Sequence, residues 1–270
     1  MRRVDVRWLR GRLGPRDLAV LRTLRTHRLA TTQQLRRWHF VDGFTSDEAS
    51  LRSCQRVLAR LERHGLLARL SQRLGGARRG AESIVWQLAT TGDRLLSVID
   101  GDHRRRYVEP GRAFISHGVA VTELAVRLHE AVRAGQLEEV SLNSEPDNWC
   151  RFLGPYGRAE ILKPDLSAIT VAGEFENHWL LERDLGSEHG PAIARKAQVY
   201  QRYYATGAYQ DEHGIFPSVL WVVDDEPRRA ALERTIAHTS GLTPGVHRVV
   251  LLGDFTAAII ANHASEGVPP

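Results

Sequence analysis

The chain's 270 residues suit two domains, and its 42% hydrophobic and 26% charged residues exclude a wholly disordered protein. Only two cysteines, Cys54 and Cys150, and no apolar run near the ~18 residues of a membrane span exclude a disulfide framework, a Cys-based zinc site and membrane insertion, so we expect a cytoplasmic protein. Residues 1–112 hold 24 of the 37 basic and 11 of the 32 acidic residues, a net charge of +13, which leaves −8 for residues 113–270 and points to a nucleic-acid-binding module in the first half.

Three helices and a hairpin are predicted first. Pro15 and Asp17 suit the first turn of a helix over 15–28. Thr31 with Gln34, and then Thr45 with Glu48, form two capping boxes that begin a second helix and a third, which ends at Gly65. The apolar runs 66–70 and 84–88, separated by a basic, Gly-rich tip, predict a β-hairpin. A short helix around 94–98, capped by Thr90 and Thr91, closes a domain over 1–100, and the polar segment 101–112 is the predicted linker.

The second domain, 113–270, alternates helix and strand patterns. The predicted helices are 114–134, 191–204 and 227–239. The predicted strands are 139–142, 165–171, 178–182, 217–223 and 247–252, with a turn at 172–174. The last two strands are almost continuously apolar, as buried parallel strands joined by a helix are. We therefore expect an α/β fold (α+β for the whole chain) with a central mixed sheet.

The order of elements in the first half is that of a winged helix-turn-helix, whose third helix enters the major groove of DNA. Arginines recur along that helix at helical intervals, at 52, 56, 60 and 63, and Ser46 and Ser50 lie near its start. The candidate DNA-binding residues are Arg52, Ser53, Arg56, Arg60, Arg73, Arg78 and Arg79. A solvated Arg face is the alternative, but the net charge of +13 favours double-stranded DNA as the partner.

One acidic cluster in the second half consists of residue types that can bind a divalent cation. Asp165 opens one predicted strand and Glu182 closes the next, so their carboxylates can approach one divalent cation together with Asp184. Lys196 and Tyr200, at i and i+4, share the face of the following helix that can stand over these carboxylates. The alternative is a set of strand-end carboxylates paired with Arg183 or Arg195.

The run of elements with Lys163-Pro164-Asp165 and Leu181-Glu182-Arg183-Asp184 resembles the PD-(D/E)xK restriction-endonuclease-like superfamily. With the preceding winged helix and the sequence Arg-Lys-Ala-Gln-Val-Tyr, residues 12–255 resemble the replication-relaxation family of bacterial plasmids and other mobile elements. The resemblance implies DNA binding in plasmid replication, conjugative transfer or their control. It implies Asp165, Glu182 and Lys196 as catalytic residues and Mg²⁺ or Mn²⁺ as the cofactor.

The sequence departs from the superfamily's motif at Asp184, where a nuclease carries Lys. Lys196 can replace that lysine from the helix; otherwise the site is inactive. Glu123 matches a position that assists metal binding in the superfamily, although a solvated helix face is the alternative. Lys163 and Tyr200 are the other accessory candidates.

Three functions stay open at this point. The first is a DNA-binding protein of a mobile element with a degenerate nuclease-like domain. The second is an active Mg²⁺-dependent DNA endonuclease targeted by its winged helix. The third is a transcriptional regulator whose second domain mediates homodimerisation or contacts replication or transfer proteins.

Overall fold

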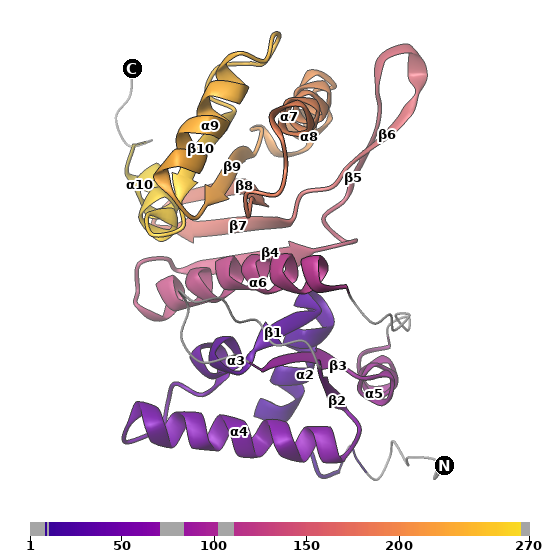
Figure 1. Cartoon of the computed structure of the whole chain (residues 1–270), viewed down its shortest axis with the longest axis vertical. Helices are drawn as coiled ribbons and strands as arrows, with labels where there is room; N and C mark the ends of the chain where they lie inside the picture. Colours follow the sequence, from indigo (N-terminus) through magenta and orange to yellow (C-terminus); the bar gives the residue numbers. More distant parts are fainter. Residues whose placement is uncertain (1–8, 10, 71–83, 102–110, 266–270) are drawn as a thin grey trace. The chain divides into compact units, whose positions relative to one another are not determined.

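The computed structural model describes residues 9, 11–70, 84–101 and 111–265. The chain forms two compact units, Met1–Val126 and Arg127–Pro270 (Figure 1). Over the described ranges it is a mixed α/β protein with nine α-helices and a five-stranded mixed sheet; the sequence predicts the α/β class and the central mixed sheet. None of these helices combines the length and the apolar character that crossing a membrane requires.

The first unit begins with the three predicted helices. They are α2 (Pro15–His27), α3 (Thr32–His39) and α4 (Asp47–Arg63). The capping box of α3 is confirmed, because Thr31 Oγ1 accepts from the Gln34 amide at 3.1 Å and Gln34 Oε1 accepts from the Thr31 amide at 2.9 Å. The predicted cap of α4 is wrong by one residue, since Ser46 Oγ accepts from the Ala49 amide in place of Thr45.

A small antiparallel sheet follows in the order β1-β3-β2. Its strands are β1 (Leu29–Thr31), β2 (Leu67–Arg69) and β3 (Val85–Leu88). The pairing of β2 with β3 confirms the two arms of the predicted hairpin, whose tip, 71–83, lies outside the described residues. The edge strand β1 has no counterpart among the sequence predictions, because three residues carry no visible period.

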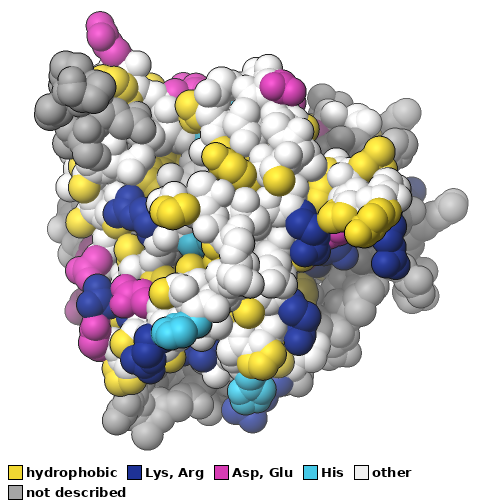
Figure 2. All heavy atoms as spheres, turned by 90° about the horizontal axis from the view of Figure 1, so that it is seen from above, with side chains coloured by type: hydrophobic (Ala, Val, Ile, Leu, Met, Phe, Trp, Pro, Cys, Tyr) yellow, Lys and Arg dark blue, Asp and Glu magenta, His cyan; other side chains and the backbone are white. Residues whose placement is uncertain are grey.

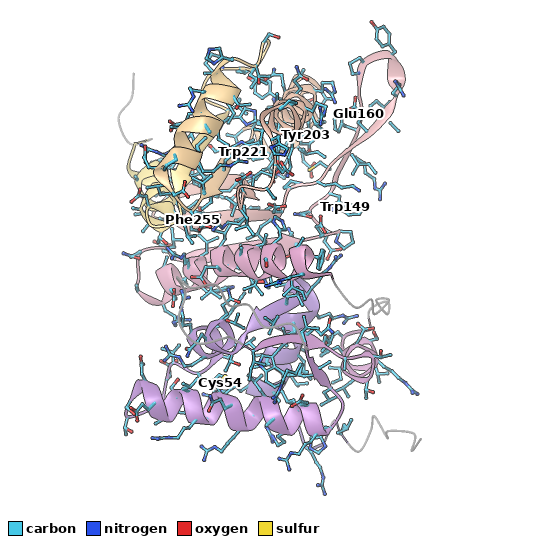
Figure 3. All side chains as sticks on the ribbon, viewed as in Figure 1. Cys54, Trp149, Glu160, Tyr203, Trp221 and Phe255 are labelled. Carbon is cyan, nitrogen blue, oxygen red and sulfur yellow. The ribbon has the colours of Figure 1, made fainter. Side chains whose placement is uncertain are left out.

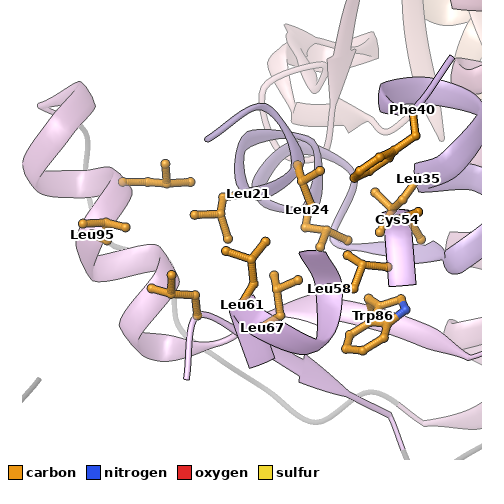
Figure 4. Packing of buried hydrophobic residues seen from close by; sticks show 14 of the residues in the cluster. Leu21, Leu24, Leu35, Phe40, Cys54, Leu58, Leu61, Leu67, Trp86 and Leu95 are labelled. Atoms are coloured by element: carbon orange, nitrogen blue, oxygen red, sulfur yellow. The ribbon is translucent and has the colours of Figure 1, made fainter. Parts of the chain in front are cut away.

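Helix α5 (Thr90–Asp100) packs closely on β2. A Cβ added at Gly92 would lie 2.3 Å from the Leu66 carbonyl oxygen, so only glycine permits this approach. The predicted threonine cap is wrong, because Ala89 holds the cap position and offers no side-chain hydrogen bond. The core between these elements holds Leu21, Leu58 and Trp86 (Figure 4).

The first part of α6 (Arg112–Arg133) belongs to the same unit. Ile115 is buried with Leu29 and Val85, and Thr122 Oγ1 donates to the Leu29 carbonyl at 2.7 Å. The sequence places its domain boundary at the linker 101–112, most of which lies outside the described residues. The boundary between the two compact units lies later in the chain, inside α6.

The second unit is built on a mixed sheet in the order β10-β9-β8-β7-β4. The strands are β4 (Glu139–Ser144), β7 (Leu166–Ala172), β8 (Phe175–Arg183), β9 (Ser218–Val223) and β10 (His247–Leu251). The first three pair antiparallel, and β8, β9 and β10 pair parallel. The predicted mixed sheet with parallel last strands is therefore confirmed.

Four helices complete this unit: α7 (Gly190–Ala205), α8 (Ala208–His213), α9 (Glu226–Ala237) and α10 (Phe255–Ser265). Helices α7 and α9 pack against each other and carry Ile193, Tyr200 and Leu232 into one core with Val219 and Trp221. A second, two-stranded sheet consists of β5 (Cys150–Leu153) and β6 (Ala159–Leu162), joined through the short 3-10 helix η1 (Pro155–Gly157). This hairpin, α8 and α10 were not predicted.

Candidate functional site

Helix α4 separates a buried face from an arginine face. Leu58 and Leu61 are fully buried against the core of the first unit (Figure 4). On the other side, Arg52, Arg56 and Arg63 are exposed. These three residues share one side of the helix, because steps of four and eleven residues return close to the same direction.

Two other polar residues of α4 have internal partners. The Arg60 guanidinium lies 2.5 Å from the carboxylate of Asp17, which is buried at the start of α2, so Arg60 links α4 to α2 rather than extending the arginine face. Ser50, near the start of the helix, is buried and donates to the Phe40 carbonyl at 2.5 Å, so its hydroxyl faces the protein interior. Ser53 is half-buried. The predicted hairpin arginines, Arg73, Arg78 and Arg79, lie outside the described residues.

Glu123 of α6 is bound by side chains of α3. Its carboxylate accepts from Arg37 Nη1 at 2.8 and 3.0 Å and from Gln34 Nε2 at 3.2 Å, all within the first unit. It is therefore not a solvated helix-face residue, because side chains of α3 bind its carboxylate. It ties α6 to α3.

The acidic cluster forms where β7 begins and β8 ends. Leu166 pairs with Leu181, so the antiparallel register sets Asp165 opposite Glu182. Asp165 Oδ2 accepts from the Arg183 backbone amide at 2.7 Å. Glu182 is buried, and the register of β8 and β9 makes Trp221, which is labelled in Figure 3, its neighbour on the other side. The register therefore places the two acidic residues at the same strand ends, where the charge of Asp165 acts on Glu182.

Lys196 and Tyr200 of α7 both bind Glu182, as their shared helix face predicts. The Lys196 ammonium and the Tyr200 hydroxyl donate to opposite oxygens of the Glu182 carboxylate. The ammonium also lies 5.8 Å from the centre of the Trp221 ring. Both oxygens of Glu182 are thus occupied by side chains of the protein itself.

Burial dominates the electrostatics of this cluster. It raises the pKa of Glu182 to about 8, with the nearby Asp165 charge adding to the rise and Lys196 opposing it. Burial alone would lower the pKa of Lys196, but the charges of Glu182 and Asp165 outweigh it and raise that pKa. Burial also raises the pKa of Tyr200, so its hydroxyl remains a proton donor.

Asp184 does not join the other two carboxylates. Its oxygens accept from Arg228 Nε and Nη2, each at 2.7 Å, and from the Gly186 amide at 2.7 Å. Arg228 comes from α9, whose approach to this strand end the sequence spacing does not reveal. Within the described ranges no group of three or more His, Cys, Asp or Glu residues is arranged to hold a metal ion, so the expected metal trio of Asp165, Glu182 and Asp184 is not formed.

Two arginines expected as partners behave differently from that expectation. Arg183 is buried on the opposite side of β8, where it donates to the Val222 carbonyl at 2.9 Å and binds Asp224. Arg195 is exposed. Lys163 lies with its ammonium 4.1 Å from the centre of the Trp149 ring. No sequence pattern indicated Arg228, Trp221 or Asp224, since the position of each depends on which helix or strand lies beside β8.

The arrangement can therefore do two things chemically. The arginine face of α4 offers three exposed cations to a polyanion. The Asp165–Glu182–Lys196 cluster brings two carboxyl groups and an ammonium together in a partly buried position at a strand end. Tyr200 serves there as a fixed hydrogen-bond donor.

Comparisons with known proteins give a family but little more. The structure of the restriction endonuclease FokI bound to DNA matches with a TM-score of 0.25 and 13% identity, over 93% of this chain and 44% of that one. This chain spans less than half of that protein, and a likeness of this size carries no argument. No curated protein matches. The model of the replication-relaxation family matches residues 21–219, most of the chain, and the protein therefore belongs to the replication-relaxation family.

Proposed function

We propose that the protein binds double-stranded DNA through a winged helix-turn-helix in its first unit and acts in the replication or conjugative transfer of a mobile element, or in the control of these processes. The observation that carries this proposal is the arginine face of α4. Arg52, Arg56 and Arg63 project from the side of α4 opposite its buried leucines, and Arg56 and Arg63 have no ion-pair partner among the described residues.

The geometry supports phosphate contact more strongly than a solubility role. Arg52 makes one exposed, 3.7 Å ion pair with Glu48, a contact of little energetic weight that DNA phosphates can displace. Cations that follow one side of a third helix can neutralise neighbouring phosphates along a groove and release their counterions. Arg60, bound to Asp17, links α4 to α2 instead.

The test compares matched arginine variants of the full chain. Arg56→Ala should weaken binding to a fluorescein-labelled duplex severalfold and make the dependence of affinity on salt less steep, because one phosphate contact is lost. Arg234→Ala removes an exposed arginine from α9 of the other unit and should leave affinity unchanged. Equal effects of the two changes, or an affinity that is the same at low and moderate salt, would contradict the proposal.

A second candidate, a DNA endonuclease, is favoured by one observation. Asp165, Glu182 and Lys196 converge at one strand end as the superfamily's motif requires, with the lysine supplied by α7. Mg²⁺ or Mn²⁺ would be the cofactor of such an enzyme. The residues do not fit that ion as they stand, because Lys196 and Tyr200 occupy both Glu182 oxygens and Arg228 holds Asp184.

Cleavage assays separate the two candidates. Plasmid DNA incubated with the full chain and Mn²⁺ or Mg²⁺ should remain intact if the closed cluster is structural. The endonuclease gains support if cleavage occurs and both Glu182→Gln and Lys196→Ala abolish it while Arg234→Ala does not. Cleavage that survives Glu182→Gln would come from a contaminant and would count against the second candidate.

A further inference from the structure

The β5–β6 hairpin differs in surface character from the unit that carries it. Phe152 and Leu162 point inward, and the Phe152 ring packs 5.3 Å from the ring of Tyr203 on α7. Glu160 is bound by Arg202 of α7 through three contacts of 2.7 to 3.0 Å. The hairpin is thus anchored along one face, and its tip extends away from the main sheet (Figure 1).

The opposite face of the hairpin is exposed and combines apolar with cationic side chains. Leu153 and Ile161 are exposed there, and Tyr156 at the tip is fully exposed. Arg151, Arg158 and Lys163 are exposed as well. Figure 2, which looks onto the molecule from the side where the hairpin tip lies, shows yellow apolar side chains bordered by dark blue cationic ones at the right of the view.

Charge indicates what this face binds. Glu160 is the only acidic residue between 150 and 163, and Arg202 neutralises it, so the exposed face offers three cations and no free carboxylate. This occurs in a half of the chain whose net charge is −8, given 13 basic and 21 acidic residues after position 112. A cationic face in an acidic unit is complementary to a polyanion.

Tyr156 indicates which class of polyanion this face binds. Its backbone is left-handed, with φ of 61°, a conformation that glycine adopts at lower cost than tyrosine, and the residue is fully exposed in the part of the chain that the structure describes, so no burial offsets the strain. Exposed aromatic rings flanked by arginines are the means by which proteins stack on unpaired bases while holding the neighbouring phosphates. A duplex hides its base faces, and an acidic protein offers no such planar group.

We propose that the β5–β6 hairpin is a second DNA contact, which binds an unpaired strand by stacking Tyr156 on a base and pairing Arg151 and Arg158 with phosphates. This goes beyond the proposed function, because the contact belongs to the other unit and discriminates single strands from the duplex. It does not depend on the arginine face of α4.

The experiment measures fluorescence anisotropy of the full chain with one labelled oligonucleotide, single-stranded and as its duplex. Tyr156→Ala should weaken single-strand binding about 5- to 100-fold, whereas Tyr156→Phe, which keeps the ring, should bind as the parent does. Arg158→Ala should weaken the same binding and reduce its salt dependence. Phe175→Ala removes a partly exposed ring from the start of β8 and should have no effect.

The outcomes separate this proposal from the first. Loss of duplex binding in Arg56→Ala with single-strand binding retained supports both, and failure of the Arg56 test leaves the Tyr156 comparison intact. Unchanged single-strand affinity in Tyr156→Ala overturns the hairpin proposal, as does an equal loss on the duplex. A self-association detected by sedimentation that Tyr156→Ala abolishes, without any change in DNA binding, would assign the face to a second copy of the chain and also overturn it. Melting temperatures of all variants should match the parent, because none removes a buried contact.

Discussion

Glu182 shows at the scale of one residue how a catalytic motif and a structural ion pair can use the same atoms. Its carboxylate is buried, so ionisation in the folded state is opposed by desolvation, and the Lys196 ammonium and Tyr200 hydroxyl offset only part of that cost. A buried pair of this kind contributes little net stability, yet removing one partner leaves the other unpaired. The same closure denies a cation access to the carboxylate.

The pH dependence of stability tests this description of Glu182. Since its pKa rises from 4.5 in the unfolded chain to about 8 in the folded one, its contribution favours folding below about 4.5 and is lost as pH rises through about 8. Glu182→Gln cannot ionise, so it should melt progressively higher relative to the parent across this range, by about 2 °C or more at the upper end. A difference that stays constant with pH, or one that shrinks, would mean that Glu182 is ionised throughout.

Asp184 gives a second test at this scale. Because Arg228 and the Gly186 amide hold its carboxylate, Asp184→Ala should lower the melting temperature by the same amount with and without millimolar Mg²⁺. The parent measured under both conditions is the control. A Mg²⁺-dependent rise in the parent that disappears in the variant would restore Asp184 as a metal ligand.

At the scale of the element, the two faces of α4 have different roles. Leu58→Ala leaves a cavity in a fully buried site and should lower the free energy of unfolding by about 2 to 5 kcal/mol. Arg56→Ala, two residues earlier and exposed, should change it by less than about 0.5 kcal/mol while weakening DNA binding. Urea unfolding of both variants measures the contrast. Comparable destabilisation by the two would contradict the division of faces.

The elements also show which features of the fold and the candidate site could be predicted from the sequence. Helices with local signals were predicted closely, as the Thr31–Gln34 box shows, because the atoms concerned lie three residues apart. Strand β1 was not predicted, because its partner, β3, lies more than fifty residues later. The convergence of Asp165, Glu182 and Lys196 followed from strand order and helix period. The pairing of Asp184 with Arg228 did not, because no local pattern places α9 beside the end of β8.

At the scale of the whole molecule, the two units divide inside α6. Ile115, Thr122 and Glu123 complete the first unit, so a fragment covering 1–133 should melt at a higher temperature than one covering 1–111. The loss of three anchoring residues and their contacts is the reason. Circular dichroism of the two fragments measures it. Equal melting temperatures would support the earlier boundary at 101–112.

The strand order of the main sheet also constrains the order in which its strands can pair while the chain is being synthesised. Strands β4, β7 and β8 pair with one another as soon as residue 183 has emerged, but β8 acquires its second neighbour only with β9, after residue 218. Until then β8, with Trp179 and Leu181 along it, is an open edge able to pair with other chains. A chain stopped after residue 217 should therefore collect in the insoluble fraction, and nascent chains of this length should be the ones that chaperones hold.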